Sequence, residues 1–268
     1  MPPQYPVLGP SVDLNLPPGS CALGVMAKTP RAGAVKTRLV PPLDAEEAAL
    51  LNTCFLQDVT GCIATLTSKS IHGYVAYTPA GQESTFDGLL PAGFRLLPQR
   101  GADLGERLLH ATEDFLAAGY DAVCLVNSDS PTLPGELLRR AIDALMSAKD
   151  RLVLGEAVDG GYYLIGVRRL HRRLFADITW SSSSVFHQTM ERARELRLEV
   201  QVLPPWYDVD DLESLRWLCD ELFGPNGRQV PANLTPYHAP HTRSYLHALI
   251  EEGGGRRLGL DPRAARVR

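Results

Sequence analysis

The sequence predicts an α/β fold with a mostly parallel central sheet and helices on both faces. Short apolar strands alternate with amphipathic helices along most of the chain, and this alternation is typical of parallel sheets. One segment, 122–126, is apolar throughout, as expected for a strand buried on both faces. It runs into the polar turn Asn127-Ser128-Asp129-Ser130. Asp129 is therefore expected at the carboxyl edge of the sheet, where α/β proteins bind ligands.

The other elements are predicted from hydrophobic periodicity and turn residues. The strongest helix signal follows Asp44, because Leu51, Phe55 and Val59 share one helical face and Asp44 with Glu47 forms a capping-box pattern. The expected helices are 44–68, 103–118, 135–148, 183–196, 210–223 and a short one at 242–252. The expected strands, besides 122–126, are 22–27, 71–78, 94–98, 152–157, 162–167 and 199–203.

Composition favours one large domain with extensions. The chain has 268 residues, 44% of them hydrophobic, and a net charge of −4, which argues against a general nucleic-acid binder. Residues 21–223 are expected to form the domain. Residues 1–20 are expected to be a flexible arm, and residues 224–268 a C-terminal extension that ends in a disordered, arginine-rich tail.

The cysteines favour a cytoplasmic protein. They are odd in number and none has Cys-x-x-Cys spacing, so free thiols in a reducing compartment are expected: Cys21, Cys54, Cys62, Cys124 and Cys219. No stretch reaches the roughly 18 apolar residues of a membrane span, and the N-terminus has no signal-peptide pattern. A homo-oligomer is compatible with these features.

A basic loop follows the first expected strand. Lys28, Arg31, Lys36 and Arg38 lie within eleven residues, and Gly33 lets the backbone approach a ligand closely. Lysine and arginine both bind phosphate oxygens, so a diphosphate is the expected ligand; a solvated loop without a ligand is the alternative. The loop is neither a Walker loop nor a Gly-x-Gly-x-x-Gly fingerprint.

Carboxylates suggest a metal site. Asp129 on a short polar turn suits Mg²⁺ or Mn²⁺ when water and phosphate complete the coordination shell. Asp208 and Asp210 are two residues apart and would point the same way in an extended chain. One of them is a candidate second metal contact, although Asp210 or Asp211 could instead cap the helix that follows.

Three weaker segments could line a ligand pocket. The turn Asp159-Gly160-Gly161-Tyr162 can bring its backbone against a sugar or phosphate, but an ordinary hairpin turn is the alternative. Trp180 and Ser181 lie in either a helix start or a ligand-contacting loop. The segment 99–107, with Gly101 and Arg107, is a candidate base- or ribose-binding loop.

Taken together, six motifs resemble one family. It comprises small bacterial glycosyltransferase-like proteins, known as radical-SAM/selenodomain-associated or arsenosugar-biosynthesis transferases, in the nucleotide-diphospho-sugar transferase superfamily. The resemblance spans roughly residues 22–222. The motifs are Lys28-x-Pro-x-x-Gly-x-Val-Lys-Thr-Arg-Leu39, Gly101-x-x-Leu-Gly-x-Arg107, Ser128-Asp-Ser-Pro-x-Leu-Pro134, Asp159-Gly-Gly-Tyr-Tyr-Leu-Ile-Gly166, Ile178-x-Trp-Ser181 and Trp206-Tyr-Asp-Val-Asp210.

The resemblance implies a glycosyltransferase A-type, Rossmann-like fold over residues 21–223 that holds a nucleoside diphosphate and a divalent metal. It implies that Lys28, Arg31, Lys36 and Arg38 hold the phosphates, and Gly101 and Arg107 of the candidate base- or ribose-binding loop are expected to contact the nucleotide. It implies that Asp129 and either Asp208 or Asp210 hold Mg²⁺ or Mn²⁺. It implies that the donor or acceptor side is lined by residues 159–162 (Asp159, Gly160, Gly161 and Tyr162), and Trp180 and Ser181 are further candidates for this pocket. This chain departs from the family pattern at Glu156-Ala157-Val158, Ser182 and Asp211, which bears on the acceptor more than on the fold.

The expected function is metal-dependent transfer of a sugar from a nucleoside diphosphate sugar to a small-molecule acceptor. The metal and Lys36 would stabilise the leaving diphosphate, and Asp159 would be the base if configuration inverts. The alternative is a guanylyl- or cytidylyltransferase-type enzyme that uses a nucleoside triphosphate and releases pyrophosphate, because Lys36-Thr-Arg-Leu39 before a long helix also resembles those enzymes. A non-catalytic nucleotide-binding protein and an α/β domain with remnant motifs are further alternatives.

Overall fold

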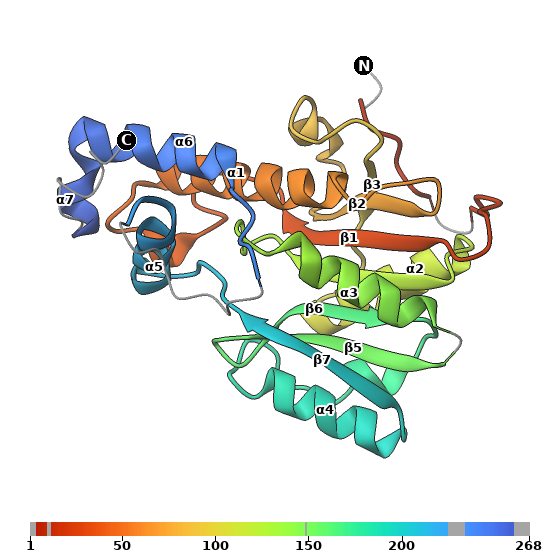
Figure 1. Ribbon diagram of the computed structural model, residues 1–268. Helices are drawn as coiled ribbons and strands as arrows, with labels where there is room; N and C mark the ends of the chain where they lie inside the picture. The colour runs from red at the N-terminus through yellow and green to blue at the C-terminus, as the bar shows by residue number, and fades with distance from the viewer. Residues whose placement is uncertain (1–3, 10–11, 148, 225–233, 260–268) are drawn as a thin grey trace.

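A seven-stranded sheet organises the computed structural model, which describes residues 4–9, 12–147, 149–224 and 234–259 (Figure 1). The strand order is β3-β2-β1-β4-β6-β5-β7. Strand β6 runs antiparallel to its neighbours β4 and β5, and the other pairs are parallel. The strands are β1 (Cys21–Lys28), β2 (Ile71–Thr78), β3 (Arg95–Pro98), β4 (Ala122–Asn127), β5 (Arg151–Ala157), β6 (Tyr162–Val167) and β7 (Glu199–Trp206). The expected mostly parallel α/β fold is confirmed.

Helices cover both faces of this sheet. They are α1 (Ala45–Ala64), α2 (Leu104–Ala117), α3 (Gly135–Met146), α4 (Val185–Glu195), α5 (Leu212–Phe223), α6 (Pro240–Leu249) and α7 (Gly255–Leu258), with short turns η1 (Thr37–Leu39), η2 (Glu83–Phe86), η3 (Arg172–Phe175) and η4 (Ile250–Gly254). One core cluster contains buried side chains of α1, α3, α5 and α6, and a second contains those of α2 and α4. The capping box expected at Asp44 and Glu47 is present at the start of α1.

The strand order reverses between β1 and β4. Strands β2 and β3 lie on one side of β1, and β4 lies on the other, so the carboxyl ends of β1 and β4 flank a topological switch point. Because β6 is antiparallel, it begins at this same edge of the sheet. The turn between β5 and β6 therefore brings residues 158–161 to the edge where β1 and β4 end.

The N-terminal segment packs along β3. Leu8 N–H donates to the Leu96 carbonyl (2.8 Å), and the Tyr5 hydroxyl donates to the Leu90 carbonyl (2.7 Å). Both Tyr5 and Leu8 are buried. The described part of this segment is anchored to the domain, while the flexibility expected for residues 1–20 and the boundaries at residues 20 and 223 stay predictions.

The C-terminal extension returns to α1. Helix α6, which corresponds to the helix expected at 242–252, lies beside α1 (Figure 1). The buried Asp58 carboxylate of α1 accepts hydrogen bonds from the backbone N–H groups of His241 (3.0 Å) and Thr242 (2.8 Å) in the first turn of α6. These bonds satisfy donors that a helix start leaves unpaired. Residues 260–268, expected to be a disordered tail, lie outside the described residues.

Free cysteines were expected from the sequence, and a membrane-spanning segment was not. The five cysteines are free, and four of them are buried. Within the described ranges, none of the helices combines the length and apolar character that crossing a membrane requires. Cytoplasmic location and oligomeric state stay predictions.

Candidate active site

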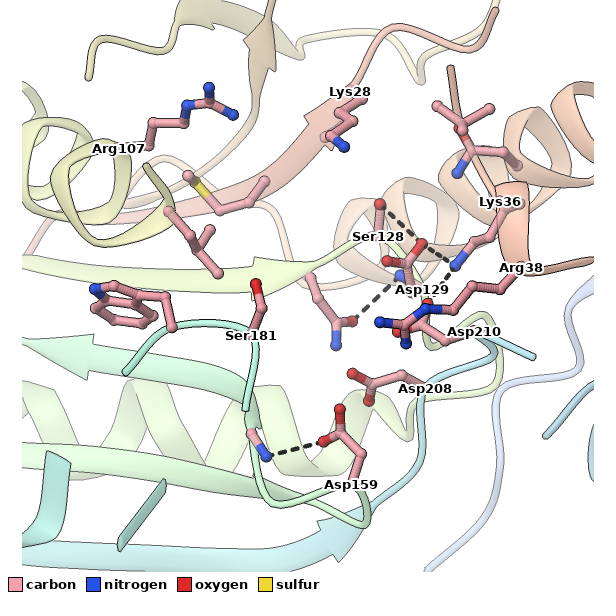
Figure 2. Close-up of a pocket in the computed structure, with 18 of the residues that line it drawn as sticks. Lys28, Lys36, Arg38, Arg107, Ser128, Asp129, Asp159, Ser181, Asp208 and Asp210 are labelled. Atoms are coloured by element: carbon pink, nitrogen blue, oxygen red, sulfur yellow. Dashed lines mark hydrogen bonds and ion pairs between the residues drawn. The ribbon is translucent and has the colours of Figure 1, made fainter. Parts of the chain in front are cut away.

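A cavity of about 610 Å³ opens at the switch point. It is bounded by the end of β1, the basic loop, the turn after β4, the β5–β6 turn, the loop before α4 and the segment after β7 (Figure 2). Twelve of the expected site residues line it: Lys28, Lys36, Arg38, Arg107, Asp129, Asp159, Gly161, Tyr162, Trp180, Ser181, Asp208 and Asp210.

Three expected residues do not line this cavity. Arg31 is exposed on the basic loop. Gly101 has a φ of +121°, and its carbonyl accepts a hydrogen bond from Arg107 Nε (3.2 Å), so it fixes the turn before α2. Gly160 packs behind the cavity wall against Ser183. The ligand contacts expected for Arg31, Gly101 and Gly160 stay predictions.

Lys36 forms ion pairs with two carboxylates of the site. Its ammonium lies 2.6 Å from an Asp129 oxygen and 3.0 Å from an Asp210 oxygen, and it donates to the Val209 carbonyl at 2.7 Å (Figure 2). Its side chain is 4% exposed. Burial lowers the pKa of Lys36, but attraction by Asp129 and Asp210 outweighs burial and raises that pKa above its ordinary value. Lys36 is therefore a charged, buried side chain.

Backbone bonds bring these residues together from distant parts of the chain. The Val209 N–H donates to the Asp129 carbonyl (2.8 Å), and the Ser130 hydroxyl donates to the Tyr207 carbonyl (3.0 Å). The turn after β4 is thereby joined to the segment after β7. This join explains why Asp129 and Asp210, far apart in sequence, reach the same ammonium.

Three carboxylates form a group beside this lysine. One oxygen each from Asp159, Asp208 and Asp210 lie within 4.8 Å of one another. Burial, followed by repulsion from Asp159, Asp129 and Asp210, raises the pKa of Asp208 to about 8. Carboxylate oxygens are the ligands that Mg²⁺ and Mn²⁺ prefer, and a divalent cation would offset this repulsion. The group fits such an ion.

The membership of this group differs from the expected metal site. Asp208 and Asp210 belong to it, but Asp129 is paired with Lys36 instead. Asp159, expected as a base, is the third member. Its orientation is fixed because its carboxylate accepts the Gly161 N–H at 2.9 Å, an interaction within the β5–β6 turn.

Two aromatic side chains, Trp180 and Tyr162, also line the cavity. Trp180 packs against α2 so closely that a Cβ on Gly105 would lie 2.2 Å from the indole nitrogen. Tyr162 meets Trp180 edge-on, with ring centroids 6.4 Å apart. Ser181 has a φ of +61°, and its hydroxyl points into the cavity (Figure 2). Left-handed backbone at a non-glycine residue costs energy and is often found at functional sites.

The loop before α4 is locked onto the β5–β6 turn. Gly160 has a φ of +89°, and a Cβ there would lie 2.1 Å from the Ser183 carbonyl oxygen. The Phe186 N–H donates to the Gly160 carbonyl at 2.9 Å. A side chain at position 160 would separate these two segments, so Gly160 supports the site without lining it.

Two further polar residues line the cavity: Gln99, which begins the segment 99–107 considered above as a ligand-binding loop, and Asn52, which the sequence did not indicate. Gln99 follows β3, and its amide donates to the carbonyls of Ala76 (2.6 Å) and Ala27 (3.3 Å). The rule that located Asp129, a polar residue directly after a strand, also applies to Gln99. Asn52 reaches the cavity from α1, and no local signal distinguishes it from an ordinary helix residue.

Comparison with known proteins places the chain and its fold in a defined class. Residues 62–182 match the family described as "Uncharacterized protein conserved in bacteria (DUF2064)". A crystal structure from Desulfovibrio desulfuricans G20, of a candidate nucleotide-diphospho-sugar transferase, is 33% identical; the alignment covers 87% of this chain and 96% of that one, with a TM-score of 0.73. The chain belongs to the DUF2064 family. Its assignment to the radical-SAM or arsenosugar group within the superfamily stays a prediction.

Two further solved structures match this chain at lower identity. A CMP:2-keto-3-deoxy-manno-octonic acid synthetase complexed with CTP is 11% identical over 75% of this chain and 98% of its own, with a TM-score of 0.46. A 4-diphosphocytidyl-2C-methyl-D-erythritol synthase is 11% identical over 74% and 96%, with a TM-score of 0.49. These similarities are too weak to support an inference about activity. No curated protein matches the sequence.

Proposed function

We propose that this protein is a metal-dependent glycosyltransferase that moves a sugar from a nucleoside diphosphate sugar to a small-molecule acceptor. The observation that carries the proposal is one cavity in which Lys28, Lys36 and Arg38 face a group of carboxylates at a topological switch point. The similarity to the candidate nucleotide-diphospho-sugar transferase supports the same class of donor.

The cationic side chains would bind the diphosphate. Lys36 and Lys28 offer ammonium groups, and Arg38 offers a guanidinium that can contact two phosphate oxygens at once. A divalent ion held by Asp159, Asp208 and Asp210 would supply further stabilisation of the charge on the leaving diphosphate. Lys28 and Arg38 already line the cavity before the substrate binds, so these two side chains would need little reorganisation during transfer.

Trp180, Tyr162 and Ser181 would hold the sugar and acceptor. Trp180 and Tyr162 offer aromatic surface for the apolar faces of a sugar ring, and the Ser181 hydroxyl offers a donor and an acceptor for hydroxyl groups. Asp159 has two proposed roles, metal ligand and base. One carboxylate oxygen cannot fill both, because an oxygen bound to a metal does not accept a proton.

Asp159→Asn separates these two roles. If Asp159 is a metal ligand, the variant loses affinity for Mn²⁺ in a calorimetric titration. If Asp159 is the base, the variant keeps Mn²⁺ binding and loses turnover. Asp143→Asn on the exposed surface of α3 is the matched control and should change neither quantity.

The central test is a thermal-shift screen of nucleoside diphosphates, nucleoside triphosphates and sugar nucleotides, with and without Mn²⁺, followed by product analysis. A nucleoside diphosphate with Mn²⁺ should raise the melting temperature more than either alone. Release of a nucleoside diphosphate from a sugar nucleotide supports the proposal. Release of pyrophosphate from a nucleoside triphosphate favours nucleotidyl transfer instead. If no nucleotide stabilises the protein, both transferase assignments fail.

A further inference from the structure

Lys36 already occupies a position that resembles a cation site. Its ammonium contacts three oxygens: Asp129 Oδ1 at 2.6 Å, the Val209 carbonyl at 2.7 Å and Asp210 Oδ1 at 3.0 Å. The side chain is 4% exposed, so water does not screen these contacts strongly. The Lys36 ammonium therefore neutralises the carboxylates of Asp129 and Asp210 in the absence of a bound cation.

Asp210 links this lysine to the group of three carboxylates. The same side chain that pairs with Lys36 also lies with Asp159 and Asp208. A carboxylate that is already neutralised by an ammonium attracts a divalent ion less strongly. Asp129, at the end of the central strand, contacts the same ammonium but lies outside the group.

We propose that Lys36 is a resident counter-ion that withholds Asp129 and Asp210 from a divalent cation until an anionic diphosphate draws its ammonium away. The inference rests on the proposed function for the identity of that anion. The lysine side chain has a flexible four-carbon stem and is not tied to one geometry. A short movement toward the diphosphate would exchange carboxylate oxygens for phosphate oxygens without leaving the ammonium unpaired.

This exchange couples the two ligands. A diphosphate that takes Lys36 increases the negative charge available to the metal, and a metal that takes Asp210 releases Lys36 for the diphosphate. Coupling between two binding equilibria is reciprocal, so each ligand must raise the affinity for the other by the same factor. Free metal would then bind weakly to the empty protein, which limits unproductive occupation of the site.

The test measures binding of Mn²⁺ alone, without nucleotide, by calorimetry and by the electron paramagnetic resonance of the unbound ion. Lys36→Met keeps the length of the side chain and removes its charge. We expect this variant to bind Mn²⁺ at least about tenfold more tightly than the unchanged protein, because one positive charge next to the carboxylates is gone. The gain should disappear when Asp210→Asn is added to Lys36→Met.

Lys28→Met is the matched control. Lys28 lines the same cavity, and no ion pair of Lys28 occurs among the described residues. Its replacement should change Mn²⁺ affinity much less than that of Lys36. An equal gain in both variants would mean that only the general charge of the cavity matters, and this would overturn the inference.

Two further outcomes decide the question. Mn²⁺ affinity that is unchanged or lower in Lys36→Met shows that the lysine does not withhold the carboxylates. If Lys36→Met does not fold, as judged by circular dichroism, Lys36→Gln replaces it. Tighter Mn²⁺ binding by Lys36→Gln would support the inference, and unchanged or weaker binding would overturn it. Failure of ADP, CDP, GDP and UDP to bind the unchanged protein would refute the proposed function separately, since the Mn²⁺ titration uses no nucleotide.

Discussion

Asp58 and Asp208 are both carboxylates removed from solvent, but Asp58 is surrounded by hydrogen-bond donors and Asp208 by other carboxylates. Asp58 is fully buried in α1 and accepts two backbone hydrogen bonds from the start of α6. Burial raises its pKa, while hydrogen bonds from Thr242 and His241 oppose that shift. Burial also raises the pKa of Asp208, but there the neighbours Asp159, Asp129 and Asp210 add to the shift.

The difference separates a carboxylate that contacts only its own chain from one that we propose to hold a ligand. The charge of Asp58 is met by positively polarised N–H groups at a helix start, which belong to the chain. A negative charge on Asp208 would be surrounded by other negative charges, so ionisation of this carboxyl is unfavourable in the empty site. A protein retains such an arrangement when a bound cation offsets it, and stability is often lower at functional sites for this reason.

Asp208→Asn should give the largest effect. If the carboxylate group holds the metal, turnover should fall by about 100-fold or more, and Mn²⁺ should no longer raise the melting temperature. Without metal, the variant should be at least as stable as the unchanged protein, because the amide never carries the negative charge that burial and the neighbouring carboxylates disfavour. Turnover assays and thermal shifts with and without Mn²⁺ measure both. If Asp208→Asn without Mn²⁺ lost as much stability as Asp58→Ala, Asp208 would stabilise the fold as Asp58 does, and the contrast between the two carboxylates would be wrong.

Asp58→Ala should reduce stability without altering the site. It leaves two N–H groups of α6 without their acceptor, which we expect to cost about 1–3 kcal/mol in the free energy of unfolding. Urea unfolding measures this cost. The increase in melting temperature produced by a nucleotide with Mn²⁺ should be preserved. A lost increase would show that the α1–α6 contact also shapes the cavity.

Gly160→Ala should have a smaller but local effect on the candidate site, and Gly33→Ala is its control. Both glycines have positive φ, +89° and +74°, but a Cβ at Gly33 meets nothing within 4 Å. Gly33→Ala should therefore lose only about 1 kcal/mol for the strained backbone. Gly160→Ala should lose more, and should also raise the KM for the acceptor, because Ser183 must move. If urea unfolding showed the same loss of stability in Gly160→Ala and Gly33→Ala, the close contact between position 160 and Ser183 would have no energetic effect.

Glu47→Gln should give the smallest effect, and it should depend on pH. A hydrogen bond from Arg257 lowers the pKa of Glu47 below its ordinary value. Since the pKa is lowered in the folded protein, the stabilisation is present above the unfolded pKa and is lost as the pH falls through the folded pKa. The difference between Glu47→Gln and the unchanged protein should therefore be measurable at pH 7 and shrink below about pH 4. A difference that is constant with pH would contradict this origin.

Local signals in the sequence were sufficient for most of the fold. Strand ends, helix caps and apolar periodicity predicted the strands 71–78 and 162–167 with their observed bounds. The start of α1 followed from the capping box at Asp44. These features depend on neighbouring residues, and so they can be predicted without knowing the rest of the structure.

The grouping within the site could not be predicted in the same way. The sequence placed Asp129 and Asp210 near the basic loop, and both reach Lys36. It did not indicate that Asp129 would pair with lysine while Asp159 joined the other carboxylates. That outcome depends on β6 pairing antiparallel with β4, a contact between distant segments that no local pattern specifies, whereas the antiparallel β5–β6 pairing is the hairpin that the Asp159-Gly160-Gly161 turn allowed.

The contact between Gly160 and the loop before α4 has a consequence for engineering this scaffold. The β5–β6 turn and residues 180–186 share a backbone hydrogen bond and a glycine-sized gap. Grafting either segment alone from a homologue would leave a mismatched pair, whereas transplanting both together would exchange one wall of the cavity and leave the sheet intact. New acceptor preferences are therefore best sought by swapping the two as a single cassette.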